Sequence, residues 1–224
     1  TTIIIEEVIV TGTRVELSRK LMPLNISVLK ENELNEYQES AVFPLISRRV
    51  PGVFVTENAV IGFGVGSNTS AGLMTMRGIG GIPNNQVLMM VDGHPQYMGL
   101  FGHPLPNSYV SSDLERVEIM RGPGSILYGS NAMGGVVNMI TKKQKEDGFS
   151  GNARLSYGSF NTQKYMINAG YRNKGFHIFT SINRDITDGH RDSSNFEITN
   201  AYIKTGYEIN KNFELVADYN IAEF

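Results

Sequence analysis

Residues 113–141 constrain the possible folds of this 224-residue chain more than any other part of it. At the start of this segment, Val117 and Ile119 alternate with polar residues. At its end, Val137 and Met139 do the same, and this period of two is typical of half-buried strands. The connection between them holds several glycines, which permit sharp turns and close backbone contacts. The segment therefore predicts a strand, a compact turn with room for one helical turn, and a second strand.

The residues before this segment predict a compact domain of helices and strands. Strands are predicted at 6–13, 25–30, 53–56, 73–77 and 86–91, and helices at 31–39 and 41–50. The run at 86–91 is nearly all apolar, as in a strand buried on both faces. Together these elements predict an α+β domain of about 140 residues, which is within the usual size range.

Long segments of alternating character follow the charged stretch 142–148. Their apolar faces lie at 149–157, 165–171, 176–182, 201–207 and 213–219. The residues between the apolar ones are largely polar, and aromatic residues stand near the segment ends. An apolar face that suits lipid and a polar face that suits a lumen are typical of the antiparallel strands of a transmembrane β-barrel.

About five such strands cannot close a barrel, and an open strand edge in lipid leaves backbone groups without partners. The predicted fold class is therefore an α+β domain followed by antiparallel transmembrane β-barrel strands of an incomplete barrel, as in a fragment. Without a full barrel, these strands are expected to be disordered or paired with another chain. Residues 6–142 are expected to fold independently.

The whole string 113–141 resembles the end of the plug domain of TonB-dependent outer-membrane receptors. Four earlier parts of the chain, 6–14, 49–53, 76–80 and 87–93, also resemble parts of such a plug and occur in the same order. The resemblance implies a plug domain at 1–143, which includes an N-terminal Ton-box-like segment. It also implies that residues 144–224 form the first part of the transmembrane β-barrel.

Composition and motifs exclude several other functions. A net charge of −2 gives no bulk attraction to nucleic acid, and the absence of cysteine excludes disulfides and thiolate metal sites. No run of 18 apolar residues predicts a spanning helix, and the start of the chain lacks the pattern of a signal peptide, as in a mature or trimmed segment. The glycine runs at 62–66 and 121–125 lack the spacing of nucleotide-binding loops. No catalytic group, metal site or cofactor is predicted, so an enzyme is not expected.

Two loops, 57–72 and 93–108, are the apical loops that the resemblance assigns to a small nutrient ligand. The candidate ligand contacts are Phe63, Asn68, His94, Tyr97, Met98, Phe101 and His103. The two histidines share one loop with aromatic residues, which is compatible with contact to haem or a metal chelate. Exposed polar loop residues are the simpler interpretation and the one that the pattern favours.

Arg77 and Arg121 each end a predicted strand and precede a glycine. The resemblance implies that these arginines pair with glutamates on the inner wall of the barrel and lock the plug. A guanidinium holds a carboxylate by two parallel hydrogen bonds and tolerates partial burial. The alternative, expected where later barrel strands are missing, is a local pair with Glu115 or Glu118, or plain solvation.

Glu6, Glu7, Val8, Ile9 and Val10 form the candidate contact with a TonB-type periplasmic energising protein. An extended segment with free edges can add as a strand to a partner sheet. The alternative is that this run is simply the first strand of the plug.

The resemblance implies a receptor in the bacterial outer membrane that contacts its lipid, with the plug on the lumen and periplasmic side. It would bind a scarce nutrient of the siderophore, haem, cobalamin or glycan class and import it by TonB-coupled movement of the plug. The alternative function is a non-transporting extracellular binding module or adhesin.

Overall fold

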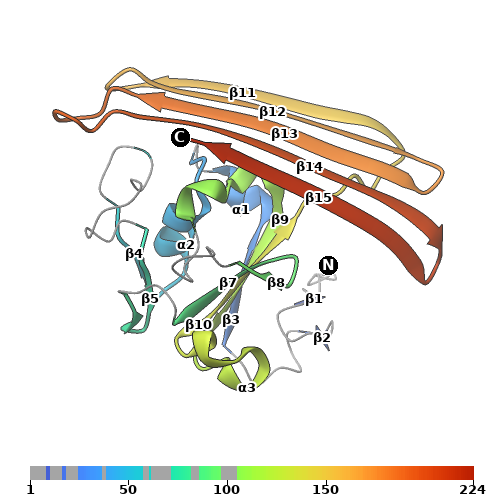
Figure 1. Cartoon of the computed structure of the whole chain (residues 1–224), viewed down its shortest axis with the longest axis horizontal. Coiled ribbons are helices and arrows are strands. Elements are labelled where there is room, and N and C mark those ends of the chain that lie inside the picture. Colours follow the sequence, from blue (N-terminus) through green and yellow to red (C-terminus); the bar gives the residue numbers. More distant parts are fainter. Residues whose placement is uncertain are drawn as a thin grey trace, which may run out of the picture.

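The computed structural model describes residues 9–10, 17–18, 25–36, 39–57, 61, 72–81, 86–96 and 105–224. Figure 1 shows two parts, which we name for use below. The small domain is the described part up to Thr141, and the wall is the broad sheet of the last five strands, which lies across one end of the small domain. No helix in the described ranges is long and apolar enough to cross a membrane.

The central sheet of the small domain has five strands in the order β3, β9, β10, β7, β8. Their bounds are β3 Ile26–Lys30, β9 Leu114–Arg121, β10 Gly135–Thr141, β7 Val87–Val91 and β8 His94–Pro95. β10 and β7 are parallel, whereas the other neighbours are antiparallel. β7 and β10 are buried on both faces over most of their length, which confirms the prediction for residues 86–91.

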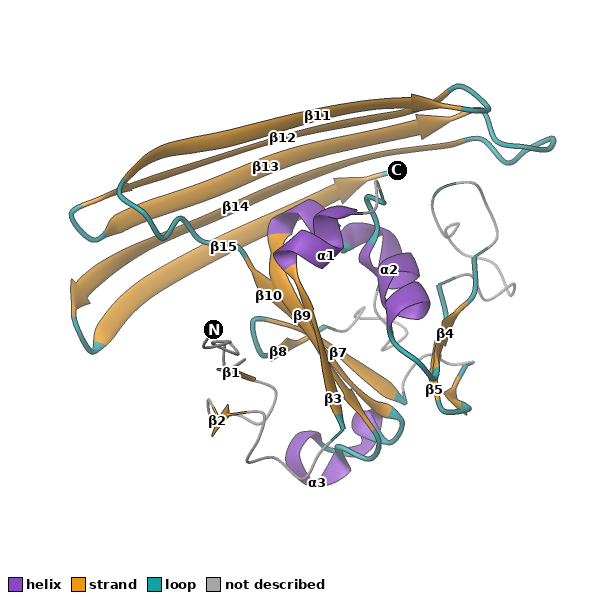
Figure 2. Cartoon of the chain, turned by 180° about the vertical axis from the view of Figure 1, so that it is seen from behind, coloured by secondary structure: helices purple, strands orange, loops and turns teal. Residues whose placement is uncertain are grey.

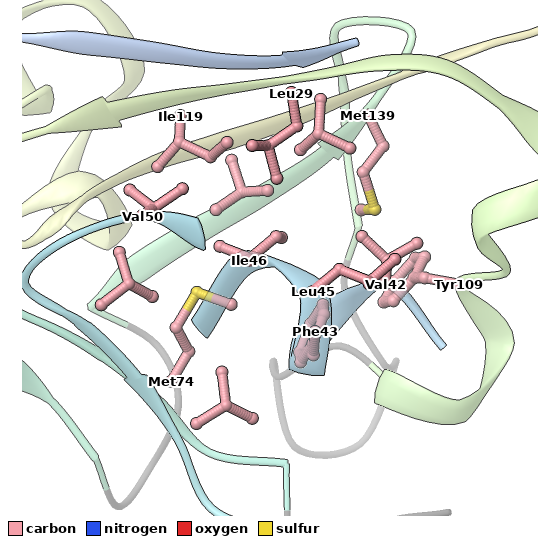
Figure 3. Packing of buried hydrophobic residues seen from close by; sticks show 14 of the residues in the cluster. Leu29, Val42, Phe43, Leu45, Ile46, Val50, Met74, Tyr109, Ile119 and Met139 are labelled. Atoms are coloured by element: carbon pink, nitrogen blue, oxygen red, sulfur yellow. The ribbon is translucent and has the colours of Figure 1, made fainter. Parts of the chain in front are cut away.

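Two helices cover one face of this sheet, α1 Glu31–Glu36 and α2 Val42–Arg49 (Figure 2). Pro44 lies in the first turn of α2, where a missing N–H costs no intrahelical bond. Figure 3 shows Phe43, Leu45 and Ile46 of α2 among the buried side chains of the core. Phe43 stacks on Tyr109 with ring centroids 5.6 Å apart. The predicted helix at 41–50 is confirmed, and the one at 31–39 is observed only as far as Glu36.

The remaining elements of the small domain are short. A three-stranded sheet contains β4 Val53–Val55, β5 Met74–Met76 and β6 Ile79–Gly80, and β1 Ile9–Val10 pairs with β2 Leu17–Ser18. The 3-10 helices are η2 Pro106–Ser108, η3 Ser111–Asp113 and η4 Ser130–Ala132.

The segment 113–141 folds as predicted, with β9 and β10 joined through α3 Ser125–Tyr128 and η4. At two of its glycines, an added side chain would meet close neighbours. A Cβ on Gly124 would lie 2.5 Å from the Cε of Met120. A Cβ on Gly135, whose φ is 155°, would lie 2.4 Å from the carbonyl oxygen of Met120. Only glycine therefore fits at Gly135 without backbone movement.

The wall is an antiparallel sheet in sequential order, with β11 Gly148–Gly158, β12 Thr162–Asn173, β13 Phe176–Thr187, β14 Phe196–Asn210 and β15 Phe213–Glu223. The expectation that these strands would be disordered or paired with another chain was wrong. Each strand pairs with the next along the chain, with one register shift near Glu208 in the pairing of β14 with β15. β12, β13 and β14 therefore have two neighbours each, and only the outermost edges are unpaired.

The two faces of the wall differ as the alternation predicts. Leu155 is 74% exposed, Ile167 60% and Ile182 57%, all on the face turned away from the small domain. On the opposite face of β13, His177 and Ser181 are buried, with at most 1% exposed. The small domain thus covers the polar face of the wall and leaves the apolar face open.

Candidate functional site

The wall meets the small domain at the beginning of β9 and the end of β10 (Figure 2), and the face that it turns toward the small domain is its polar one. Several groups of polar side chains join the two parts there. Because these groups hold the small domain in place, we treat this interface as the candidate functional site.

The first group consists of Asp92, Thr141 and Lys204. Lys204, from β14, places Nζ 2.8 Å from Oδ2 of Asp92 and 2.6 Å from Oγ1 of Thr141. Thr141 donates its backbone N–H to Oδ1 of Asp92 over 2.9 Å and its hydroxyl to Oδ2 over 2.6 Å. One carboxylate therefore ties the turn after β7, the end of β10 and the wall together.

Local sequence fixes the position of Asp92. Asp92 and Gly93 have φ values of 47° and 80° and form the tight turn between β7 and β8. An Asp-Gly pair is well suited to such a turn, because both central residues need positive φ. The N–H of Asp92 donates to the carbonyl of Met139, and that of Gly93 donates to Oδ1 of Asn138. The turn is thus anchored to β10 by its backbone, and the carboxylate is left to face the wall.

The second group surrounds Asp113 at the end of η3. Ser181 of β13 donates its hydroxyl to Oδ1 of Asp113. The hydroxyl of Ser112 lies 3.1 Å from the same oxygen and 3.0 Å from Oδ1 of Asn183. Burial raises the pKa of Asp113 to about 6, although these hydrogen bonds and the charge of Lys142 act in the opposite direction. This carboxyl is therefore poorly solvated and is held by neutral donors rather than by a salt bridge.

A third group lies around Glu39, whose carboxylate is 3.1 Å from Nη1 of Arg48 and 3.5 Å from Nζ of Lys164 on β12. Beside it is a small polar cavity of about 20 Å³ between the small domain and the wall, which has room for about one water molecule. Asn183 of β13 also lines this cavity.

A fourth group anchors the connection between the two parts. Nε2 of His177 lies 2.6 Å from Oε1 of Glu214, and Nζ of Lys143 lies 3.2 Å from the same oxygen. His177 is fully buried, and a Cβ on Gly206 would lie 2.5 Å from its Nε2. Gly206 therefore makes room for the imidazole, and Lys143 ties the segment after β10 to β15.

The two predicted lock arginines meet at another place, the turn formed by Pro51 and Gly52. Arg121 donates from Nη1 to the carbonyl of Pro51 over 3.0 Å and from Nη2 to Oδ1 of Asn25. The N–H of Arg77 donates to the carbonyl of Gly52 over 2.7 Å. β9 begins at the wall and ends at Arg121, so this turn lies at the end of the small domain away from the wall.

The hydrogen bonds of the Arg121 guanidinium go to Pro51 and Asn25 rather than to Glu115 or Glu118, the two glutamates named in the local alternative. Instead, Arg116 pairs with Glu115 at 3.0 Å and with Glu118 at 2.8 Å. Nε of Arg121 is buried and has no partner within the described part of the chain. Arg77 is exposed and adopts a φ of 52°, which is uncommon for a residue with a side chain.

The other predicted site residues fall largely outside the described residues. Of the ligand candidates only His94 is described, and it is exposed in β8. Phe63, Asn68, Tyr97, Met98, Phe101 and His103 lie outside the described ranges, as do Glu6, Glu7 and Val8 of the coupling segment. Ile9 and Val10 form β1, where Ile9 pairs with Ser18 and Val10 with Leu17.

Sequence reasoning missed the contacts of Asp92, Asp113 and Lys204. Lys204 stands on the polar face of an alternating segment and Asp92 in a recognisable turn, so each position had a signal. The two residues are 112 positions apart, however, and nothing local links them. Within the described ranges, no group of three or more histidine or acidic side chains is placed to hold a metal ion.

Comparison with known proteins gives consistent matches. The family model described as the TonB-dependent Receptor Plug Domain matches residues 18–136. Vitamin B12 transporter BtuB of Vibrio vulnificus (strain CMCP6) is 29% identical over 174 residues, which cover 74% of this chain and 26% of that protein. The chain thus spans about a quarter of the length of this curated relative.

Solved structures share the fold at lower identity. The ferripyoverdine receptor of the outer membrane of Pseudomonas aeruginosa superposes with a TM-score of 0.75 at 16% identity, over 95% of this chain and 27% of that one. BauA, the ferric preacinetobactin receptor from Acinetobacter baumannii, gives a TM-score of 0.75 at 18% identity, over 95% and 30% of the two chains.

Proposed function

The chain belongs to the TonB-dependent receptors of the bacterial outer membrane, and from this premise we propose that the protein containing it imports a scarce nutrient. In this proposal the small domain is the plug and the wall is the first part of the barrel. The observation that carries the proposal is the seating of the small domain on the polar face of a wall whose other face is apolar. Such a wall suits lipid on one side and a plugged lumen on the other.

For the division of the chain, we propose a plug at 1–143 and the first barrel strands at 144–224. The last direct contact of the small domain with β14 is made by Thr141, at the end of β10. β11 begins at Gly148, so the charged residues between them form the connection.

The nutrient belongs in this proposal to the siderophore, haem, cobalamin or glycan class, bound by the loops that contain Phe63, Asn68, His94, Tyr97, Met98, Phe101 and His103. The exposed imidazole of His94 is compatible with such a role. Cobalamin and ferric siderophores are the first candidates to test, because a vitamin B12 transporter and siderophore receptors are among the similar proteins. No observation on the described residues specifically favours the alternative function, a non-transporting binding module or adhesin.

Arg77 and Arg121 are proposed to lock the plug to later strands of the barrel. Support comes from their convergence on one turn, the partnerless Nε of Arg121 and the left-handed backbone of Arg77. A carboxylate that reached this turn would satisfy Nε and pair with both charges.

Glu6, Glu7, Val8, Ile9 and Val10 are proposed as the segment that the TonB-type energising protein pulls. The two-residue pairing of β1 with β2 supports this, because so short a ladder gives little resistance to a pull.

Uptake by the full-length receptor tests the proposed function. The receptor is expressed in cells that lack their own receptors, and uptake of radiolabelled cobalamin and a panel of ferric siderophores is measured. We expect at least one compound to accumulate in cells with an active energising protein and to bind without accumulating in cells without it. Surface binding without energised accumulation of any compound, in cells shown to energise another receptor, would favour the binding module.

A further inference from the structure

Lys204 lies between two acidic side chains, one on the small domain and one on its own sheet. Its ammonium binds Asp92 and Thr141. On the other side, Lys204 is directly opposite Asp218 in the register between β14 and β15. Directly opposite residues share one face of a sheet, with Cβ atoms about 4.5–5.5 Å apart. Both carboxylates are therefore within reach of the same side chain.

The two acids differ in what they bind. Both oxygens of the Asp92 carboxylate are used, by Thr141 and by Lys204. The exposed carboxylate of Asp218 makes no hydrogen bond or ion pair with any described residue. Lys204 therefore has two acidic neighbours. Asp92 on the plug is already bound to it, and Asp218 on the neighbouring strand is available to bind it.

Burial makes the first contact costly to break. The side chain of Lys204 is 10% exposed and that of Asp92 is 25% exposed. Removing one partner of a buried ion pair leaves a charge without compensation, which is strongly unfavourable. The carboxylate of Asp218 lowers the cost of breaking this ion pair, because Lys204 can exchange Asp92 for Asp218 as its partner.

We propose that Lys204 is the positioning residue of a plug latch, which binds Asp92 and Thr141 at rest and passes to Asp218 when the plug leaves the wall. The inference rests on the proposed function, since it supposes that the plug moves relative to the wall. The contact has the opposite polarity to the arginine lock, with the cation on the barrel and the acid on the plug. It also joins the plug to the early strands of the barrel.

Forced extraction of the plug tests the latch without nutrient or energising protein. The full-length receptor is reconstituted in lipid bilayers, its N-terminus is pulled at constant force, and the rate of plug extraction is recorded. Lys204→Met removes the charge at similar side-chain length, and we expect extraction about tenfold faster than in the unaltered receptor. Lys204→Arg keeps the charge and should restore a rate within about threefold of the unaltered receptor.

The control for the lysine is Lys211→Met, in the exposed turn between β14 and β15, which should extract at the unaltered rate. An unaltered rate in Lys204→Met would overturn the latch. Equally fast extraction in the Lys204→Met and Lys204→Arg variants would also overturn the latch. It would show that the extraction rate does not depend on the charge of this side chain.

The acceptor half of the proposal has its own variant. Asp218→Asn leaves the resting contact intact and removes the second partner, so we expect extraction about threefold slower than in the unaltered receptor. Glu223→Gln is the matched control, because it removes an acid from the opposite face of the same strand. Equal rates in these two variants would overturn the transfer to Asp218. If the unaltered receptor imports no nutrient, the proposed function fails, whereas the extraction rates still decide the latch.

Discussion

At the scale of single residues, burial decides the chemistry of Asp113. This carboxyl is 4% exposed and accepts a hydrogen bond from Ser181 of the wall. Its pKa is raised from an ordinary value of 3.8 to about 6, because burial disfavours the charged form. An acid with a raised folded pKa stabilises the folded protein most below the ordinary pKa, and that stabilisation is lost as the pH rises through the folded pKa.

We therefore predict that Asp113 makes the attachment of plug to wall weaker between pH 4 and pH 6 and adds no further change above that window. Asp113→Asn keeps an acceptor oxygen for Ser181 and removes the charge. Relative to the unaltered receptor, the variant should be more stable at pH 7.5 than at pH 4 by about 2 kcal/mol. Calorimetry of the plug transition in detergent, at several pH values, measures this. Parallel pH curves for the two proteins would refute the assignment.

At the scale of elements, the plug depends on glycines where strands and turns come close. Gly135 begins β10 with a φ of 155°, and a Cβ there would lie 2.4 Å from the carbonyl oxygen of Met120 and from the sulfur of Met76. The carbonyl belongs to a backbone that is paired with β10, so it cannot move without breaking the ladder. The constraint therefore comes from the join between β9 and β10.

Gly135→Ala should destabilise the plug by about 2 kcal/mol or more, through overpacking and an unfavourable φ. Gly158→Ala is the control, because a Cβ there would lie 4.0 Å from the nearest atom, Cβ of Thr162. Chemical denaturation of the purified receptor, followed by a probe in the plug, gives both values. Equal stability of the two variants would show that β10 can shift to accept a side chain.

The coupling segment is also best tested as an element. Val8 lies outside the described residues, directly before β1. Val8→Pro should abolish energised uptake and leave nutrient binding at the surface intact, because proline removes a backbone donor and fixes φ in a strand that must pair with a partner. Binding and uptake are measured on the same cells. Normal uptake would remove this segment as the coupling site, and a loss of binding as well would indicate damage to the plug itself.

At the scale of the whole molecule, the plug contacts the wall at one end, and the proposed arginine lock lies at the other. Asp92, Asp113 and their partners hold one end to the early strands of the barrel. The turn near Arg77 and Arg121, where we propose the arginine lock, lies at the other end. A plug held at both ends would block a lumen more tightly than a plug held at one.

Arg121→Ala in the full-length receptor should therefore raise passive leak of a bulky antibiotic severalfold and leave insertion into the outer membrane intact. The partnerless Nε of Arg121 motivates this prediction. Arg116→Ala is the control, because its ion pairs with Glu115 and Glu118 lie within the small domain. Antibiotic susceptibility at equal receptor levels measures the leak, and equal susceptibility in the two variants would count against the lock.

The sequence alone determined the order and type of the main elements. The strand, glycine-rich turn and strand at 113–141, the buried strand at 86–91 and the alternation of the wall were all predicted and are all observed. These features depend on residues that are close along the chain, where periodicity and glycine chemistry act directly. The family resemblance rested on the same local strings and is confirmed by the family match over residues 18–136.

Only the tertiary structure decided which polar residues hold plug and wall together. A lysine on the polar face of a strand has the same pattern whether it faces water or an aspartate, so Lys204 gave no sign of its contact with Asp92. The raised pKa of Asp113 depends on the surface that covers it, because desolvation is a property of packing rather than of local sequence. Periodicity therefore fixed the faces of the strands, and the docking of one sheet on another fixed the partners of their side chains.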